Sequence, residues 1–107
     1  MASLVKHVVL VKFNEDITAE LRESLIQGFH ALPGLIPDIK AFEWGTDVSV
    51  ENRHQGFTHA FVLTFDSPEG RNAYLVHPSH EEFADKILAA VEKVTIFDYN
   101  PSPVQCQ

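Results

Sequence analysis

The chain has 107 residues, enough for one hydrophobic core but not for two, so we expect a single domain with its core over about residues 5–100. Eight lysines and arginines stand against fifteen aspartates and glutamates, and the formal net charge of −7 argues against nucleic acids and anionic membranes as partners. Other protein chains and small molecules remain as possible partners.

Cysteine usage and hydropathy indicate a soluble protein of a reducing compartment. Cys106 is the only cysteine and lies in a C-terminal tail that we expect to be flexible, so neither a disulfide framework nor a zinc cluster can form. No apolar stretch of signal-peptide length precedes Val5, and no run approaches the roughly 20 apolar residues of a membrane span. We therefore expect a cytoplasmic protein.

The first half of the chain predicts a strand, a helix and a second strand. Residues 6–13 are rich in Val and Leu and read as a strand that is apolar on both faces. A helix is expected to begin at Thr18 and to end before Pro33-Gly34, and residues 39–44 form the second strand. The apolar stripe of the helix comprises Leu21, Leu25, Phe29 and Leu32.

The second half predicts a polar loop, a strand, two helices and a last strand. The loop covers residues 47–56 and the strand residues 58–65. Ser67 caps a short helix with Pro68 in its first position. The expected long helix and last strand cover residues 80–91 and 94–99, with Phe83, Ile87, Leu88 and Val91 as the inward positions of the helix.

The break between the two helices falls in the segment Tyr74 to His80. Pro78 disfavours helical geometry at His77, so Ser79 is expected to cap the next helix, with Glu82 completing a capping box. His80 then lies in the first turn, where the helix dipole disfavours its protonated form. A neutral imidazole at that position can act as a base.

The order β-α-β-β-α-β predicts a ferredoxin-like α+β sandwich with an antiparallel sheet of strand order 4-1-3-2. Helices cover only one face of such a sheet, although the first and third strands are apolar on both. A second copy is the simplest cover for the other face. We therefore expect a homodimer that forms a dimeric α+β barrel.

This topology brings four polar residues to one edge of the sheet. His7 begins the first strand and Asp98 ends the antiparallel last strand, while the third strand leads to Tyr74 and then His80 at the same edge. His59 begins the third strand at the opposite edge, so we discount it as a catalytic group.

Each of these residues also has a structural interpretation. The Tyr74 hydroxyl could bond a backbone carbonyl, and His7 with Asp98 could form a buried pair that only satisfies the strand edges. His77 is expected to end a helix. A metal shared by His77 and His80 is disfavoured, because no acidic third ligand stands at a clear spacing.

Six short segments carry a family resemblance over nearly the whole chain. They are Val5-Lys6-His7, Lys12-Phe13, Phe42-Glu43-Trp44-Gly45, Gly56-Phe57-Thr58-His59, His77-Pro78-Ser79-His80 and Ile96-Phe97-Asp98-Tyr99. In this order and spacing they resemble the plant stress-responsive dimeric α+β barrel (Dabb) family. That family includes a polyketide cyclase as well as members described only as stress-responsive or antifungal proteins.

The resemblance implies an intramolecular aldol cyclisation of a linear polyketide, carried out by acid/base catalysis without metal or cofactor. It implies His80 as the base and Tyr74 as the hydrogen-bond donor, with Asp98 orienting the imidazole and His7 in support. Phe29, Val91 and Ile26 differ from the cyclase, so the pocket has another shape. The expected pocket residues are Ile26, Phe29, Phe61, Phe83, Val91 and Ile96.

Two other functions stay open. The same barrel could be a non-catalytic stress-responsive or defence protein, or it could be a carrier of an aromatic or polyketide small molecule. Relatives that are not enzymes also have a tyrosine and a histidine-proline-x-histidine segment, so these residues alone do not separate the three alternatives.

Overall fold

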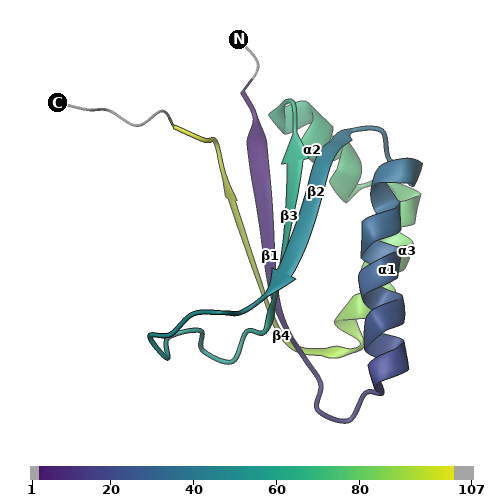
Figure 1. Cartoon of the computed structure of the whole chain (residues 1–107). Coiled ribbons are helices and arrows are strands. Elements are labelled where there is room, and N and C mark those ends of the chain that lie inside the picture. Colours follow the sequence, from purple (N-terminus) through teal and green to yellow (C-terminus); the bar gives the residue numbers. More distant parts are fainter. Residues whose placement is uncertain (1–2, 103–107) are drawn as a thin grey trace, which may run out of the picture.

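Four strands and three helices follow one another in the predicted order in the computed structural model, which describes residues 3–102 (Figure 1). The second helical connection is divided in two, as expected. The elements are β1 (Val5–Phe13), α1 (Ala19–Leu35), β2 (Ile39–Thr46), β3 (His59–Phe65), α2 (Pro68–Leu75), α3 (Pro78–Leu88) and β4 (Val91–Tyr99). Cys106 and most of the expected flexible tail lie outside the described residues.

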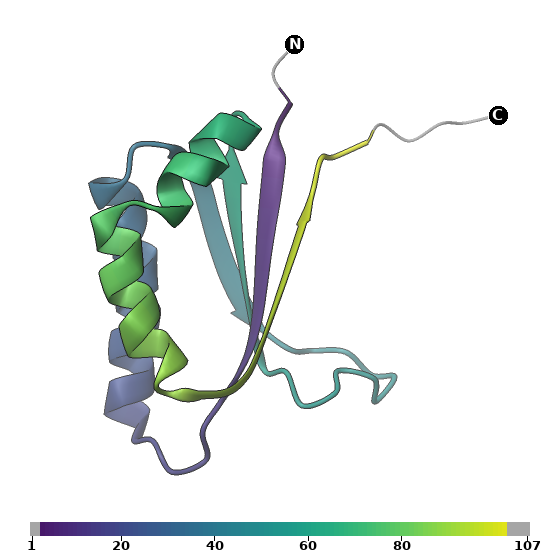
Figure 2. The ribbon, with the colours of Figure 1, turned by 180° about the vertical axis from the view of Figure 1, so that it is seen from behind.

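The strands form one antiparallel sheet of order β2-β3-β1-β4, which confirms the predicted topology. All three helices lie on one face of this sheet, and two opposite views show the same layer of helices (Figures 1 and 2). The fold is therefore a ferredoxin-like α+β sandwich of two layers.

The hydrophobic core lies between the helices and the inner face of the sheet. Burial alternates along β1, with every second residue from Val5 to Phe13 facing the helices. Phe29 of α1 joins the two layers: its ring centroid lies 4.6 Å from that of Phe61 and 5.0 Å from that of Phe83. The core therefore contains a continuous aromatic contact from the sheet to α3.

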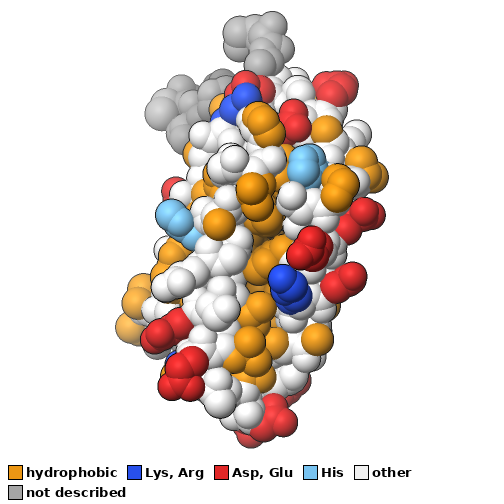
Figure 3. All heavy atoms as spheres, turned by 90° about the vertical axis from the view of Figure 1, so that its right-hand side faces the viewer, with side chains coloured by type: hydrophobic (Ala, Val, Ile, Leu, Met, Phe, Trp, Pro, Cys, Tyr) orange, Lys and Arg blue, Asp and Glu red, His pale blue; other side chains and the backbone are white. Residues whose placement is uncertain are grey.

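The helices α1 and α3 pack closely, and apolar side chains follow the seam between them on the helical side of the molecule (Figure 3). Gly28 makes this approach feasible. A Cβ atom at this position would lie 3.1 Å from the ring of Phe83, which is tighter than ordinary van der Waals contact.

The outer face of the sheet has no helix over it. Val8 and Leu10 of β1 and Val62 of β3 are only half-buried, and Phe97 of β4 is 65% exposed. The register places Val8 between Val62 and Phe97, so these side chains form one apolar surface. In the described chain the strands β1 and β3 are thus apolar on both faces but fully covered on only one.

Helix α1 extends three residues beyond its predicted end, through Pro33, Gly34 and Leu35. Proline costs one backbone hydrogen bond inside a helix, but Leu32, one residue before Pro33, and Ile36, three residues after it, are both buried. The Ile36 N–H donates to the Leu32 carbonyl at 2.8 Å and closes the helix. Burial of these two side chains outweighs the local signal to stop.

Helix α3 begins two residues earlier than predicted, and its cap is His77 instead of Ser79. The Ser79 N–H donates to Nδ1 of His77 at 3.1 Å, so the expected capping box with Glu82 is wrong. Pro78 occupies the first helical position, where its missing N–H has no cost. His80 still falls in the first turn, as predicted.

The predicted boundary between the last helix and the last strand is also wrong. Helix α3 ends at Leu88, and Val91 begins β4, where it pairs with Phe13 next to a register shift that leaves Glu92 of β4 as the extra residue. The Ala90 carbonyl accepts from the Asn14 N–H at 2.8 Å and fixes this turn. The expected cap Ser67 of α2 is confirmed, and Thr18, expected to begin the first helix, is the cap of α1. Within residues 3–102, no helix has the length and hydropathy to cross a membrane.

The inward face of α1 can be tested by two leucines one turn apart. Leu25 is 5% exposed and Leu21 is 44% exposed. Leu25→Ala should lower the free energy of unfolding by about 2–5 kcal/mol, because it leaves a cavity in the core. Leu21→Ala, the matched control, should cost less than about 1 kcal/mol. Urea unfolding of both variants measures the difference, and equal costs would contradict this placement of α1.

Candidate functional site

Four polar residues from four elements meet at one edge of the sheet, as the topology predicted. His7 and Asp98 are direct partners in the register of β1 and β4, and Nδ1 of His7 lies 2.7 Å from Oδ1 of Asp98. The Tyr74 ring centroid lies 5.7 Å from the ring of His7 and 4.3 Å from the ring of His80. The contacts therefore run in the order Asp98, His7, Tyr74, His80.

Tyr74 is the one buried residue of the eight-residue helix α2, which Ser67 caps. Its ring packs against Phe65 of β3 with the centroids 5.2 Å apart. Among residues 3–102 the Tyr74 hydroxyl makes no hydrogen bond, so the interpretation in which it bonds a backbone carbonyl is wrong. Every fully buried side-chain oxygen of these residues has a hydrogen-bond partner. Because the Tyr74 hydroxyl has none, it must keep some solvent-accessible surface.

His80 is held by the end of the preceding helix. Its Nδ1 lies 3.1 Å from the carbonyl oxygen of Leu75, one of the terminal carbonyls of α2 that have no partner within their helix. A carbonyl can only accept a hydrogen bond, so Nδ1 carries the proton and donates. In the neutral ring, Nε2 is then free to accept a proton.

The surroundings keep both groups in their neutral forms. Burial lowers the pKa of His80 below its ordinary value, and the nearby His7 and His77 act in the same direction against the Leu75 carbonyl and Glu81. The expected neutral imidazole is thus supported, with loss of solvent as its largest cause. Burial raises the pKa of the Tyr74 phenol, which stays protonated and able to donate.

Asp98 does not orient His80, and this part of the sequence interpretation is wrong. Its Oδ1 contacts His7, and its Oδ2 lies 2.7 Å from Nη1 of Arg71. The register fixes Asp98 opposite His7, whereas the imidazole of His80 bonds the end of α2. Sequence reasoning missed Arg71, although it stands three residues before Tyr74, a spacing that puts two side chains on one face of a helix.

A cavity of about 170 Å³ lies beside these residues, between the sheet and the helices. His7, Tyr74 and His80 form its polar end. Of the expected pocket residues, Phe29, Phe83, Val91 and Ile96 line it. Ile26 and Phe61 do not line it, because they are buried in the packed core. The apolar lining residues that the sequence interpretation did not include are Val9, Val11, Leu75, Ala84, Ile87, Leu88 and Val94.

His77 and His59 lie outside this group of converging residues. His77 caps α3, which agrees with its expected position at the end of a helix. His59 lies at the opposite end of the sheet, where it pairs with Val11 and stacks on Trp44 with the ring centroids 6.2 Å apart. Within residues 3–102, no group of three or more His, Cys, Asp or Glu side chains is arranged to hold a metal ion.

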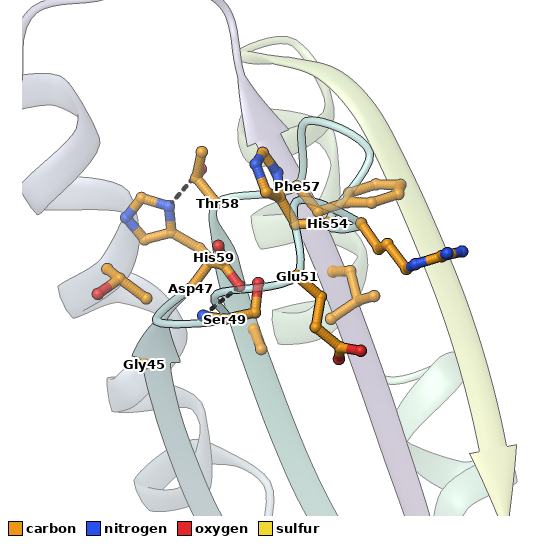
Figure 4. Close-up of a pocket in the computed structure, with 12 residues that line it drawn as sticks. Gly45, Asp47, Ser49, Glu51, His54, Phe57, Thr58 and His59 are labelled. Atoms are coloured by element: carbon orange, nitrogen blue, oxygen red, sulfur yellow. Dashed lines mark hydrogen bonds between the residues drawn. The ribbon is translucent and has the colours of Figure 1, made fainter.

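A second cavity, of about 450 Å³, lies at the loop between β2 and β3 (Figure 4). Its polar side chains bond their own neighbours: the Ser49 N–H donates to Asp47, and Nδ1 of His59 lies 2.7 Å from the Thr58 hydroxyl. None of the four converging residues lines it. Despite its larger volume, it is the weaker candidate for acid/base chemistry.

Two curated plant proteins match most of this chain. The stress-response A/B barrel domain-containing protein HS1 of Arabidopsis thaliana is 48% identical over 100 residues, which are 94% of this chain and 92% of that protein. Olivetolic acid cyclase of Cannabis sativa is 38% identical over 97 residues, which are 91% of this chain and 96% of the cyclase.

Solved structures share the fold. The hydroxynitrile lyase from Passiflora edulis matches with a TM-score of 0.93 at 28% identity, over 99% of this chain and 100% of the lyase chain. A dimeric protein of ferredoxin-like fold from Bacteroides fragilis matches with a TM-score of 0.70 at 26% identity, over 92% of this chain and 96% of the other.

The model of one protein family, described as the stress responsive A/B barrel domain, matches residues 5–101. This range contains all seven elements of the fold and all four converging residues. The chain belongs to the stress responsive A/B barrel domain family.

Proposed function

We propose that this protein is a polyketide-cyclase-like enzyme that closes a ring in a linear polyketide by intramolecular aldol condensation. One observation carries the proposal: the rings of His80 and Tyr74 lie with their centroids 4.3 Å apart, and both residues line one end of an apolar cavity. The similarity to olivetolic acid cyclase supports this reaction class.

The reaction needs a base and a hydrogen-bond donor. Nε2 of His80 removes a proton from a methylene between two carbonyls, and the enolate carbon attacks a third carbonyl of the same molecule. As the new carbon–carbon bond forms, the electron pair of that carbonyl moves to its oxygen. The phenol of Tyr74 donates to this oxyanion, and the proton held by His80 then neutralises it. The hydroxyl group so formed leaves as water together with the second proton of the attacking carbon, which completes the condensation.

The cavity limits what can react inside it. Its volume of about 170 Å³ is close to that of engineered protein cavities that take up benzene. It therefore suits the part of a polyketide that becomes the ring. Its apolar lining excludes water from the enolate, which favours attack on the carbonyl over protonation by solvent.

A non-catalytic barrel is the second candidate, because HS1, at 48% identity, is described only by its stress response and its domain. A shared fold does not fix the function. In that case the cavity either contributes to the stability of the fold or carries an aromatic or polyketide ligand. Tyr74 and His80 then catalyse no reaction.

We infer that two copies pair through the outer face of the sheet. Val8, Leu10, Val62 and Phe97 form an apolar surface that no part of residues 3–102 covers. Exposed apolar surfaces of this kind mark interfaces. The dimeric neighbour from Bacteroides fragilis has the same fold, and its description supports the inference.

The assembly predicts a sedimentation mass near twice the chain mass of 12.0 kDa. Val62→Asp should give a monomer, because it would bury an unpaired charge in the interface at a cost of several kcal/mol. Val76→Asp is the matched control, since Val76 is 71% exposed at the end of α2 and should leave the mass unchanged. A wild-type monomer at micromolar concentration would refute the dimer.

Removal of either catalytic group should lower turnover strongly. His80→Ala and Tyr74→Phe should each cost about 10²-fold or more in kcat, the usual scale for a general base or an oxyanion donor. The assay couples the protein to a polyketide synthase and measures the cyclised product. His59→Ala is the control, since this histidine lies at the opposite end of the sheet and should keep full turnover.

The same assay separates the two candidate functions. Unchanged turnover in His80→Ala would show that the proposed base is wrong. If the wild-type protein never cyclises the polyketide but binds it, and if only a cavity-filling variant such as Val91→Trp abolishes binding, the protein is a carrier.

Turnover should rise with pH through the pKa of His80. Below that pKa the imidazole is protonated and cannot remove a proton, and above it Nε2 is free. Burial lowers this pKa beneath the ordinary value of about 6.5, so kcat should already be level at neutral pH and fall only in acid. A kcat profile from about pH 4.5 to 8 measures the midpoint, and a midpoint above about 6.5 would contradict the assigned environment.

A further inference from the structure

One carboxylate joins an arginine to a histidine at the polar end of the cavity. Asp98 places Oδ1 2.7 Å from Nδ1 of His7 and Oδ2 2.7 Å from Nη1 of Arg71. The side chains of Asp98 and Arg71 are 24% and 25% exposed, and that of His7 is 4% exposed. Charged hydrogen bonds this short and this shielded hold their groups more firmly than surface ion pairs.

This arrangement selects one tautomer of His7. The carboxylate of Asp98, paired with a guanidinium, is an acceptor only, so the proton between Asp98 and His7 belongs to Nδ1. In the neutral ring, Nε2 then has no proton and can only accept. Nε2 of His7 makes no hydrogen bond within residues 3–102. Every fully buried side-chain nitrogen of these residues has a hydrogen-bond partner, so Nε2 of His7 must keep some solvent-accessible surface. The ring of His7 lines the cavity, which supplies that surface.

Arg71 is the part of this arrangement that comes from the helical layer. It belongs to α2, the helix that carries Tyr74, while Asp98 belongs to the edge strand β4. The ion pair therefore ties the position of the carboxylate to the helix that positions the phenol. Without the guanidinium, Asp98 keeps a single partner and can rotate, and either nitrogen of His7 can then carry the proton.

We propose that Arg71 is a positioning residue of the cavity, which acts through Asp98 to keep Nε2 of His7 as a hydrogen-bond acceptor for the ligand. This inference rests on the proposed function in placing the ligand beside Tyr74 and His80. It assigns to His7 a direct contact with the ligand, and to Asp98 and Arg71 the task of holding His7.

The polar end of the cavity then defines a ligand class. It offers one donor, the Tyr74 hydroxyl, and two acceptors, the Nε2 atoms of His7 and His80. The remainder of the lining is apolar. An enol or phenol with a carbonyl on the neighbouring carbon matches this set, because its hydroxyl donates to His7 while its carbonyl oxygen accepts from Tyr74. Both the enolised 1,3-diketone of a polyketide and an aromatic cyclisation product belong to this class.

The first measurement is the tautomer of His7 by ¹⁵N NMR of the labelled protein at about pH 8, where a free histidine is neutral. The wild-type protein should give a protonated Nδ1 and an unprotonated Nε2. Arg71→Met, which keeps much of the side-chain length but removes the charge, should give a mixture of the two tautomers. Arg71→Lys should restore most of the wild-type pattern, because it keeps the positive charge but lacks the planar fork.

The second measurement compares binding of phenol and toluene, which differ by a hydroxyl in place of a methyl group. The wild-type protein should prefer phenol about three- to tenfold, the worth of one net hydrogen bond. Arg71→Met should lose most of this preference while its affinity for toluene stays the same. Arg53→Met is the control, since Arg53 lines the distant loop cavity and should leave both affinities unchanged.

Each result decides the proposal without reference to turnover. If Arg71→Met keeps both the wild-type tautomer and the preference for phenol, or if the wild-type protein binds the two compounds equally, Arg71 has no positioning role. Should Arg71→Met fail to fold, Arg71→Gln, which removes the charge but keeps a polar side chain, carries the same test: a mixture of tautomers supports the positioning role and the wild-type tautomer overturns it. A protein that shows the Arg71-dependent preference but never cyclises a polyketide would overturn the catalytic proposal and keep this one.

Discussion

The pairing register of β1 against β4 decides where the polar groups of this protein lie. It sets His7 opposite Asp98, Val9 opposite Ile96 and Val11 opposite Val94, all on the face that the helices cover. Because side chains alternate along a strand, a slip of the register by one residue would turn the inward-facing side chains of one of the two strands to the outer face. The Asp98–His7 contact and much of the apolar cavity wall thus depend on one hydrogen-bonded ladder.

The second constraint is the break between α2 and α3. Pro78 cannot continue α2, and it leaves terminal carbonyls without partners within their helix. One of them, the carbonyl of Leu75, accepts from His80 in the first turn of the next helix. The break that ends α2 therefore also sets the tautomer of His80 and directs its free nitrogen away from the backbone. The end of α2 and the tautomer of His80 therefore have the same cause, which is the break in the helix before Pro78.

The two faces of the sheet carry different features. The inner face carries the cavity and the buried polar contacts, while the outer face carries an apolar surface without a cover. Relatives with this fold include a protein named for a stress response, a cyclase and a lyase. A shared fold therefore does not fix the function.

The burial of polar groups near the cavity sets a balance between stability and chemistry. His80 has lost part of its contact with water, which favours the neutral form of its imidazole. Asp98 is also partly buried, but its carboxylate contacts the imidazole of His7 and the guanidinium of Arg71, so its charge is compensated. Buried charges without such partners are strongly destabilising, and this explains why the carboxylate has both oxygens engaged.

Although Leu21, expected to face inward, is 44% exposed, the sequence by itself determined the order of the elements, the alternating faces of the strands, and the convergence of His7, Tyr74, His80 and Asp98. Those features follow from periodicity and chain direction, which are readable residue by residue. Only the tertiary structure decided that Asp98 bonds His7 and Arg71 and not His80. It also decided that Ile26 and Phe61 belong to the packed core, that α1 continues past its proline, and that His77 caps α3. Hydrogen-bond partners and cavity walls depend on distances of a few ångströms between layers, and these distances are set by packing between residues that are far apart in the chain.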